Sequence, residues 1–150
     1  MGKTGRTSSI KVDNKMTDRL IKFPERNSQI IDFAGLNRRR GITPTDIDGF
    51  IDYGGNAFVY FDAKIDGVPV SKGQRRAYEN IVNSHRKAGN RAVAFIFRHN
   101  TPHEESVIAS EGIVDEIYTT SGWEKRKDRQ TVIELIEEIE RVWDKAGIKL

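Results

Sequence analysis

The chain of 150 residues is long enough to bury the core of one domain without disulfides or a structural metal. It contains no cysteine, which excludes disulfides, thiol nucleophiles, iron–sulfur clusters and cysteine-bound zinc, and which suits a reducing cytoplasm. The net charge of +3 permits an anionic partner, and no apolar run approaches the roughly 20 residues that span a membrane, so we expect a cytoplasmic protein without a membrane partner.

The first part of the chain shows little periodicity. Residues 1–9 have almost no apolar side chain to offset the entropy of ordering them, so we expect a disordered tail on a single domain that spans residues 1–150. Pro24 interrupts the scattered apolar residues that follow, and a short helix is predicted around residues 27–33. Residues 38–45 are predicted to form a basic loop.

The middle of the chain carries clear secondary-structure signals. Residues 46–65 alternate between apolar and charged side chains, which is typical of β-strands, and the glycine-rich segment 54–56 makes them a hairpin. Residues 71–88 have the periodicity of an amphipathic helix. Residues 91–98 form an apolar run of strand length, typical of a strand covered on both faces, and residues 113–119 are predicted to form a further strand.

A last amphipathic helix is predicted from a cap at Asp128 to Ala146, and Gly147 closes it. The order hairpin, helix, buried strand, strand and helix predicts an α/β fold, in which a mixed β-sheet with an antiparallel hairpin is flanked by helices.

Carboxylates and a lysine converge on one face of the predicted hairpin. With a three-residue loop, the numbers of cross-strand partners sum to 110, so Asp48 lies opposite Asp62 and Asp46 opposite Lys64. These side chains could form a solvated face with an ion pair. Alternatively, the carboxylates could hold Mg²⁺, which binds one or two carboxylates, water and phosphate oxygens, while the lysine orients a water molecule.

These residues resemble the PD-(D/E)XK nuclease superfamily. The segment 43–49, TPTDIDG, is similar to the family's first acidic strand, and the segment 61–64, FDAK, is similar to its second, which carries the (D/E)-x-K element. The segment 74–78, QRRAY, resembles the Q-x-x-x-Y element of the exonuclease V-like branch. The resemblance implies a restriction-endonuclease-like core and a metal-dependent DNA nuclease, of bacterial or phage type, that acts in recombination, repair or restriction.

The resemblance also implies roles for individual residues. Asp48 and Asp62 would ligate Mg²⁺ or Mn²⁺, the carbonyl of Ala63 would be a further ligand, and Lys64 would position the nucleophilic water. Asp46 is the alternative upstream ligand, whereas Asp52 lies near the turn and too far from Lys64 to share one ion.

Gln74 has two interpretations. It could act at the site beside Lys64, or it could complete a capping box by returning its side chain to the backbone of Ser71. Glu25 is a candidate for the glutamate that several members of the family carry on a helix before the first strand.

Basic side chains before the first strand and in the helix after Lys64 are predicted to contact nucleic-acid phosphates. They are Arg38, Arg39, Arg40, Arg75 and Arg76.

Two other classes of protein remain open. A catalytically inactive nuclease-like fold could serve as a nucleic-acid-binding or assembly module, and a scaffold protein could dock a basic partner on the acidic segment 134–140. Because a nuclease that cuts duplex DNA has two strands to cleave, a homodimer is a further expectation.

Overall fold

The computed structural model describes residues 32–150, which fall in two units, residues 32–44 and residues 45–150. The expectations for residues 1–9 and Glu25 lie outside the described residues, as does most of the helix predicted at 27–33. The last two residues of that helix, Asp32 and Phe33, are not helical. In the first unit, short 3-10 helices span Ala34–Leu36 and Arg39–Gly41.

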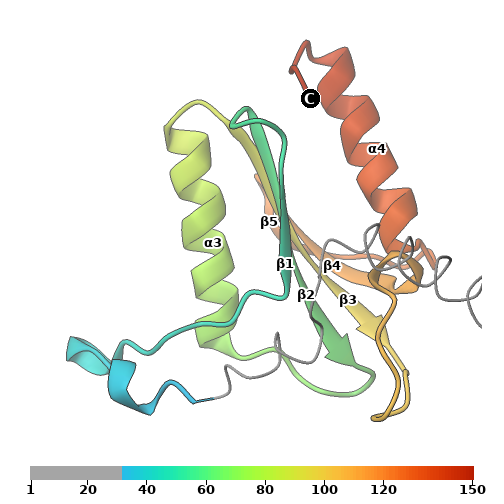
Figure 1. Ribbon diagram of the computed structural model, residues 1–150. Helices are drawn as coiled ribbons and strands as arrows, with labels where there is room; N and C mark the ends of the chain where they lie inside the picture. The colour runs from blue at the N-terminus through green and yellow to red at the C-terminus, as the bar shows by residue number, and fades with distance from the viewer. Residues whose placement is uncertain (1–31) are drawn as a thin grey trace, which may run out of the picture. The chain divides into compact units, whose positions relative to one another are not determined.

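The second unit is built on one mixed five-stranded sheet (Figure 1). Its strands, in spatial as well as chain order, are β1 (Gly49–Asp52), β2 (Ala57–Ile65), β3 (Arg91–His99), β4 (Ile113–Thr119) and β5 (Gly122–Lys125). β2 and β3 are parallel, and the other neighbouring pairs are antiparallel. The parallel pair therefore needs a crossover connection, which a helix supplies.

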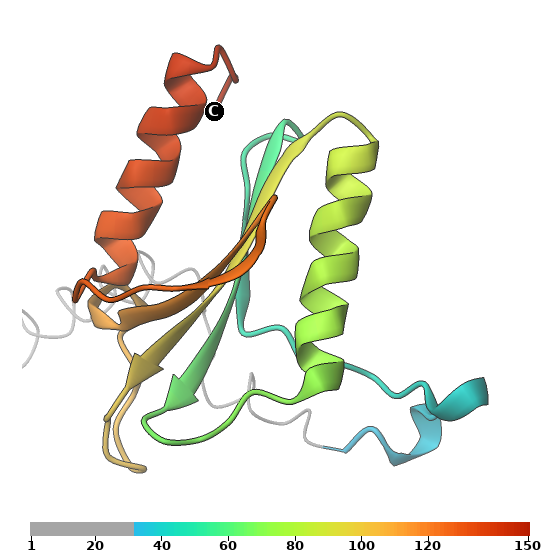
Figure 2. The same cartoon turned by 180° about the vertical axis from the view of Figure 1, so that it is seen from behind.

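Two long helices lie on opposite faces of the sheet (Figures 1 and 2). Helix α3 (Lys72–Lys87) makes the crossover from β2 to β3, and helix α4 (Val132–Lys145) follows β5. A 3-10 helix, Ala109–Glu111, precedes β4. This α/β architecture, with a mixed sheet, an antiparallel hairpin and helices on both faces, confirms the predicted fold class. In residues 32–150, no helix has both the length and the apolar composition that a membrane crossing requires.

Each face of the sheet packs a separate apolar cluster. On the α4 face, Val59, Phe95 and Phe97 pack with Leu135 and Trp143. The cluster on the α3 face contains four buried residues, which are Tyr78, Val82, Ala92 and Ala94. β3 is therefore covered on both sides, as its continuous apolar run predicts.

The even-numbered face of the hairpin is partly covered by α3, whereas one interpretation of the sequence made it a solvated face with an ion pair. Phe58 and Tyr60 pack against the cluster under α3, and Asp62 is only 1% exposed. The predicted register is confirmed, because the observed partners Gly49 and Phe61, like the other pairs of β1 and β2, sum to 110. Periodicity fixed the register, but it could not show that a helix would cover the charged face.

The start of the last helix differs from the prediction. The N-cap is Thr131, whose side chain accepts a hydrogen bond from the backbone N–H of Glu134 while Glu134 bonds back to Thr131 in a full capping box. Asp128 cannot cap α4, because the chain before Thr131 still runs beside β4. Gln130 accepts a hydrogen bond from the Val114 N–H, and Thr131 bridges Ile113.

Gly112 is a position where the fold requires the absence of a side chain. A Cβ atom there would overlap the ring of Phe97, which is 1% exposed and held by the core. We expect Gly112→Ala to lower the free energy of unfolding by about 1–3 kcal/mol. The measurement is urea denaturation followed by circular dichroism.

Gly73, on the exposed side of α3, is the matched control, since a Cβ atom there would meet nothing within 4 Å. Gly73→Ala should leave stability unchanged or raise it by up to ~1 kcal/mol, because alanine favours the helix. Equal stability of the Gly112→Ala variant and the parent would contradict the packing described for Phe97.

Candidate functional site

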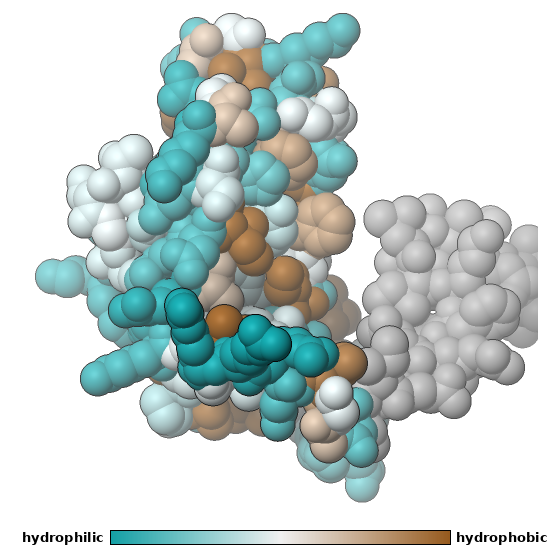
Figure 3. All heavy atoms as spheres, turned by 90° about the vertical axis from the view of Figure 1, so that its left-hand side faces the viewer, coloured by the Kyte–Doolittle hydropathy of each residue, from teal (hydrophilic) through white to brown (hydrophobic). Residues whose placement is uncertain are grey.

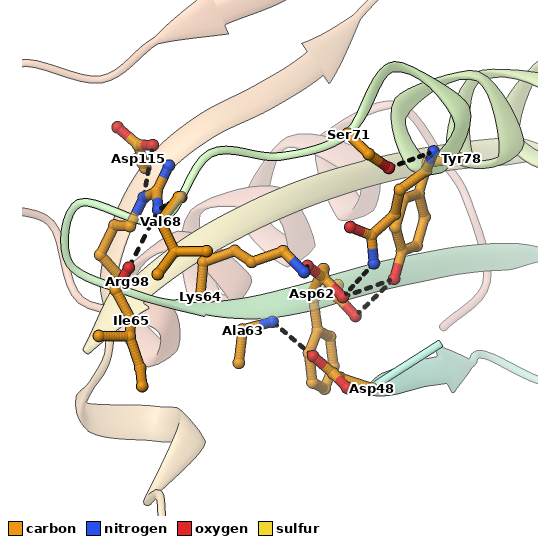
Figure 4. A network of polar contacts seen from close by, with 12 residues as sticks. Asp48, Asp62, Ala63, Lys64, Ile65, Val68, Ser71, Tyr78, Arg98 and Asp115 are labelled. Carbon is orange, nitrogen blue, oxygen red and sulfur yellow. Dashed lines mark hydrogen bonds and ion pairs between the residues drawn. The ribbon is translucent and has the colours of Figure 1, made fainter. Parts of the chain in front are cut away.

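Asp48 and Asp62 meet at the open end of the hairpin (Figure 4). Asp48 directly precedes β1 and is exposed, whereas Asp62 lies within β2 and is buried. The backbone N–H of Ala63 donates a hydrogen bond to Asp48 Oδ2 at 2.7 Å. This bond holds the Asp48 carboxylate beside β2 in the place that the register predicts, although Asp48 itself is outside the paired strand.

Three side chains surround the buried carboxylate of Asp62. Lys64 Nζ lies 3.1 Å from Asp62 Oδ2 and forms an ion pair with it. Gln74 Nε2 donates a hydrogen bond to Asp62 Oδ1 at 2.9 Å. The Tyr78 hydroxyl lies 3.5 Å from the same oxygen and 3.2 Å from the carbonyl oxygen of Phe61. These three side chains come from one strand and the first turns of one helix, and Asp48, which precedes β1, completes the polar surroundings of Asp62.

The structure shows which partner the Gln74 side chain takes. Its backbone N–H donates to Ser71 Oγ at 3.1 Å, so Ser71 caps α3 as predicted. Its side chain does not return to Ser71 as in a capping box but extends to Asp62. The backbone of Gln74 thus takes part in the cap of α3, and its side chain contacts the candidate metal ligand Asp62.

Tyr78 was not among the predicted site residues. It lies four positions after Gln74, so both side chains fall on the same face of α3 and reach the same carboxylate. The spacing in Q-x-x-x-Y was the signal that could have identified it, but an aromatic residue on an apolar helix face is more often part of the core.

The electrostatics of the site favour a proton or a cation at Asp62. Burial, followed by the charge of Asp48, raises the pKa of Asp62 from 3.8 to about 6, against the opposing effect of Lys64. Burial, together with the charges of Asp62 and Asp48, also raises the pKa of the Tyr78 phenol, which therefore stays protonated and able to donate a hydrogen bond.

The donor set fits a hard divalent cation. The carboxylates of Asp48 and Asp62 offer oxygen atoms of the kind that Mg²⁺ prefers. Among the described residues, the buried Oδ2 of Asp62 accepts no hydrogen bond of good geometry apart from its ion pair with Lys64. His, Asp and Glu side chains of residues 32–150 form no group of three or more that would hold a metal ion. Mg²⁺ needs only one or two carboxylates, because water and phosphate oxygens complete its coordination.

Asp46, the alternative upstream ligand, and Asp52 make no hydrogen bond or ion pair with Asp62, Lys64 or Gln74 in the described residues. Asp46 is exposed, precedes the start of β1, and takes part in no hydrogen bond or ion pair among residues 32–150. Asp52 accepts a hydrogen bond from the Gly55 N–H at 2.7 Å and so stabilises the hairpin turn. Of the upstream aspartates, Asp48 is therefore the one whose carboxylate reaches Ala63.

The predicted phosphate-binding arginines have different surroundings. Arg38, Arg39 and Arg40 are exposed on the first unit, and Arg76 is exposed on α3. Arg75 is half-buried, pairs with the buried Glu116 at 2.5 Å, and lies over the ring of Trp123. Arg75 thus has a structural partner, and phosphate contact by all five arginines stays a prediction.

The strand end beyond Lys64 is tied to the rest of the sheet. Arg98 on β3 pairs with Asp115 at 3.0 Å and donates hydrogen bonds to the carbonyl oxygens of Ile65 and Val68 (Figure 4). These contacts hold the loop that leads from β2 to α3. They therefore help to position both Lys64 and the helix that carries Gln74.

Comparison with known proteins finds no matching protein family, no matching curated protein and no matching solved structure.

The raised pKa of Asp62 predicts a pH-dependent stability. Because the folded state holds this proton more tightly than the unfolded state, Asp62 favours folding at acidic pH, and this contribution is lost as the pH rises through about 6. Relative to Asp62→Asn, the parent should lose about 2 kcal/mol between pH 4 and pH 8. Urea denaturation in EDTA at each pH measures this difference, with the exposed Asp66→Asn as the control.

Removal of Arg75 should leave Glu116, which is 6% exposed, as a buried charge whose remaining cationic partner among the described residues is the exposed Lys125 at 3.5 Å. We expect Arg75→Ala to lower the free energy of unfolding by about 3 kcal/mol. Its exposed neighbour is a matched control, and Arg76→Ala should change stability by less than ~0.5 kcal/mol. Thermal or urea denaturation compares the two variants, and equal effects would contradict a structural role for the Arg75–Glu116 pair.

Proposed function

We propose that this protein is a metal-dependent nuclease that hydrolyses phosphodiester bonds of DNA through a PD-(D/E)XK-type site on a restriction-endonuclease-like core. The observation that carries the proposal is the buried Asp62 carboxylate, which has Lys64, Gln74 and Tyr78 around it and Asp48 beside it. A solvated ion pair does not require such burial. Burying a carboxylate next to a second one costs free energy, and a cation-binding function accounts for this cost.

Asp48 and Asp62, with the carbonyl oxygen of Ala63, are the groups that would hold Mg²⁺ or Mn²⁺. When bound, such an ion lowers the pKa of water and offsets negative charge at the phosphate. The Ala63 N–H keeps Asp48 in place, while Gln74 and Tyr78 fix the orientation of the Asp62 carboxylate through their hydrogen bonds.

Lys64 supplies the positive charge next to Asp62. Its side chain is about one-fifth exposed, at 22%, so its ammonium group can reach solvent from its position next to Asp62. In the proposed reaction the ammonium orients the attacking water and stabilises the charge that develops on the phosphate. Replacing it with a neutral side chain removes both effects.

Cleavage of DNA in the presence of a divalent metal tests the proposal. Circular, linear, single-stranded and four-way-branched DNA are incubated with the full chain in Mg²⁺, Mn²⁺ or EDTA. We expect cutting only with metal, and a loss of about 100-fold or more in both Asp62→Asn and Lys64→Met. The first variant removes a charged ligand of the metal ion, and the second removes the positive charge that acts on the attacking water and the reacting phosphate. Asp66→Asn should keep the parent rate.

Metal binding has its own readout. Mn²⁺ should raise the melting temperature of the parent, and the shift should grow with the logarithm of the Mn²⁺ concentration above the dissociation constant. This shift should vanish in Asp62→Asn and Asp48→Asn. A parent that binds Mn²⁺ but cuts no DNA would favour the inactive binding module. The absence of both metal stabilisation and cutting would overturn the proposal.

A further inference from the structure

An exposed aromatic side chain stands out on the hairpin. Phe50 of β1, the edge strand of the sheet, is 59% exposed, although it belongs to a well-packed part of the fold. Seen from the side on which α3 lies, the surface is mainly hydrophilic, with apolar atoms between the polar ones (Figure 3). An exposed phenylalanine on an edge strand carries a cost in solubility, so its position calls for a physical account.

Phe50 is the outer member of a stack of rings. Its ring stacks on Tyr60 with centroids 5.6 Å apart and an interplanar angle of 19°. The Tyr60 hydroxyl hydrogen-bonds His85 Nε2 at 2.8 Å, and His85 in turn stacks on Phe58 at 3.9 Å. Because the inner rings are fixed by α3 and β2, the outer ring of Phe50 is held in a defined orientation.

The stack lies directly beside the candidate site. Phe50 and Tyr60 are cross-strand partners, and the same register, continued by two residues along each strand, places Asp48 opposite Asp62. Side chains two residues apart on a strand share a face and are about 7 Å apart, close to the spacing of successive nucleotides in an extended strand. A DNA strand with one phosphate next to the Asp48 and Asp62 carboxylates would therefore bring a neighbouring base to Phe50.

We propose that Phe50, supported by Tyr60, is a stacking platform for an unpaired nucleobase next to the cleaved phosphate, an inference that rests on the proposed nuclease function. Aromatic rings bind the faces of all bases, so this contact recognises single-stranded character and not sequence. Bases inside a duplex have both faces occupied by their neighbours. The substrate class is accordingly DNA with unpaired nucleotides at the cut, such as a single strand, a flap or a branch point.

Binding in EDTA tests the platform without cleavage. Fluorescence anisotropy compares a labelled single-stranded oligonucleotide with its duplex. Phe50→Ala should weaken single-strand binding by about 5- to 150-fold and duplex binding by less than about 2-fold, whereas Phe50→Trp should retain single-strand binding. Val142→Ala on α4 is the matched control, because Val142 is also 59% exposed but lies across the sheet.

The outcomes separate the two proposals. The platform is overturned, even if the parent cuts DNA, when Phe50→Ala leaves the affinity for single strands unchanged. It is also overturned when Phe50→Ala lowers the affinity for single strands and for duplex equally. An exposed edge strand could also bind a second copy of the chain, and sedimentation of the parent and of Phe50→Ala tests this alternative. A parent dimer that Phe50→Ala dissociates would also overturn the platform. A parent that does not cut, but whose selective single-strand binding depends on Phe50, would retain the platform and remove the nuclease.

Discussion

The buried carboxylate of Asp62 is the constraint on which the organisation of this end of the sheet depends. An ionised carboxylate without partners inside a protein costs several kcal/mol, so the chain must bring donors and a cation to it. Lys64 comes from the same strand, and Gln74 and Tyr78 come from the first turns of α3. The helix therefore does more than cover the sheet, because its N-terminal turns supply the polar groups that make the burial tolerable.

A second buried acid, Glu116, lies under the same helix. Asp62 on β2 and Glu116 on β4 are both partners of Ile96 on β3, so the two acids lie on either side of this central strand. Arg75 follows Gln74 directly in α3 and pairs with Glu116, as Gln74 bonds Asp62. Consecutive residues of one helical turn thus serve two buried carboxylates, and a change in the position of α3 would disturb both contacts together.

The sequence predicts the elements and the hairpin register well, because both follow from local periodicity and turn chemistry. The placement of Asp48 opposite Asp62 required only the three-residue loop and the alternation of side chains. The helix start at Thr131 carries a local signal, the Thr131-x-x-Glu134 capping box, which competed with Asp128 as a cap. The strand β5 depends instead on pairing with β4, which no local pattern encodes. In the same way, burial of Asp62 depends on where α3 packs. Local spacing allowed the Gln74 side chain to bond either the Ser71 backbone or Asp62, and it could not distinguish these two partners.

Lys64 links the free-energy cost of burying the Asp62 carboxylate to the proposed chemistry of the site. In this structure the Lys64 ammonium pairs with Asp62 and partly opposes the rise in its pKa caused by burial and Asp48. A divalent cation held by the two aspartates would take over that neutralisation more completely, since it carries twice the charge. Lys64 would then be free to turn from Asp62 toward a water or a phosphate oxygen. The ion pair therefore partly neutralises the buried Asp62 carboxylate and, in the proposed function, holds the Lys64 ammonium next to the reacting phosphate.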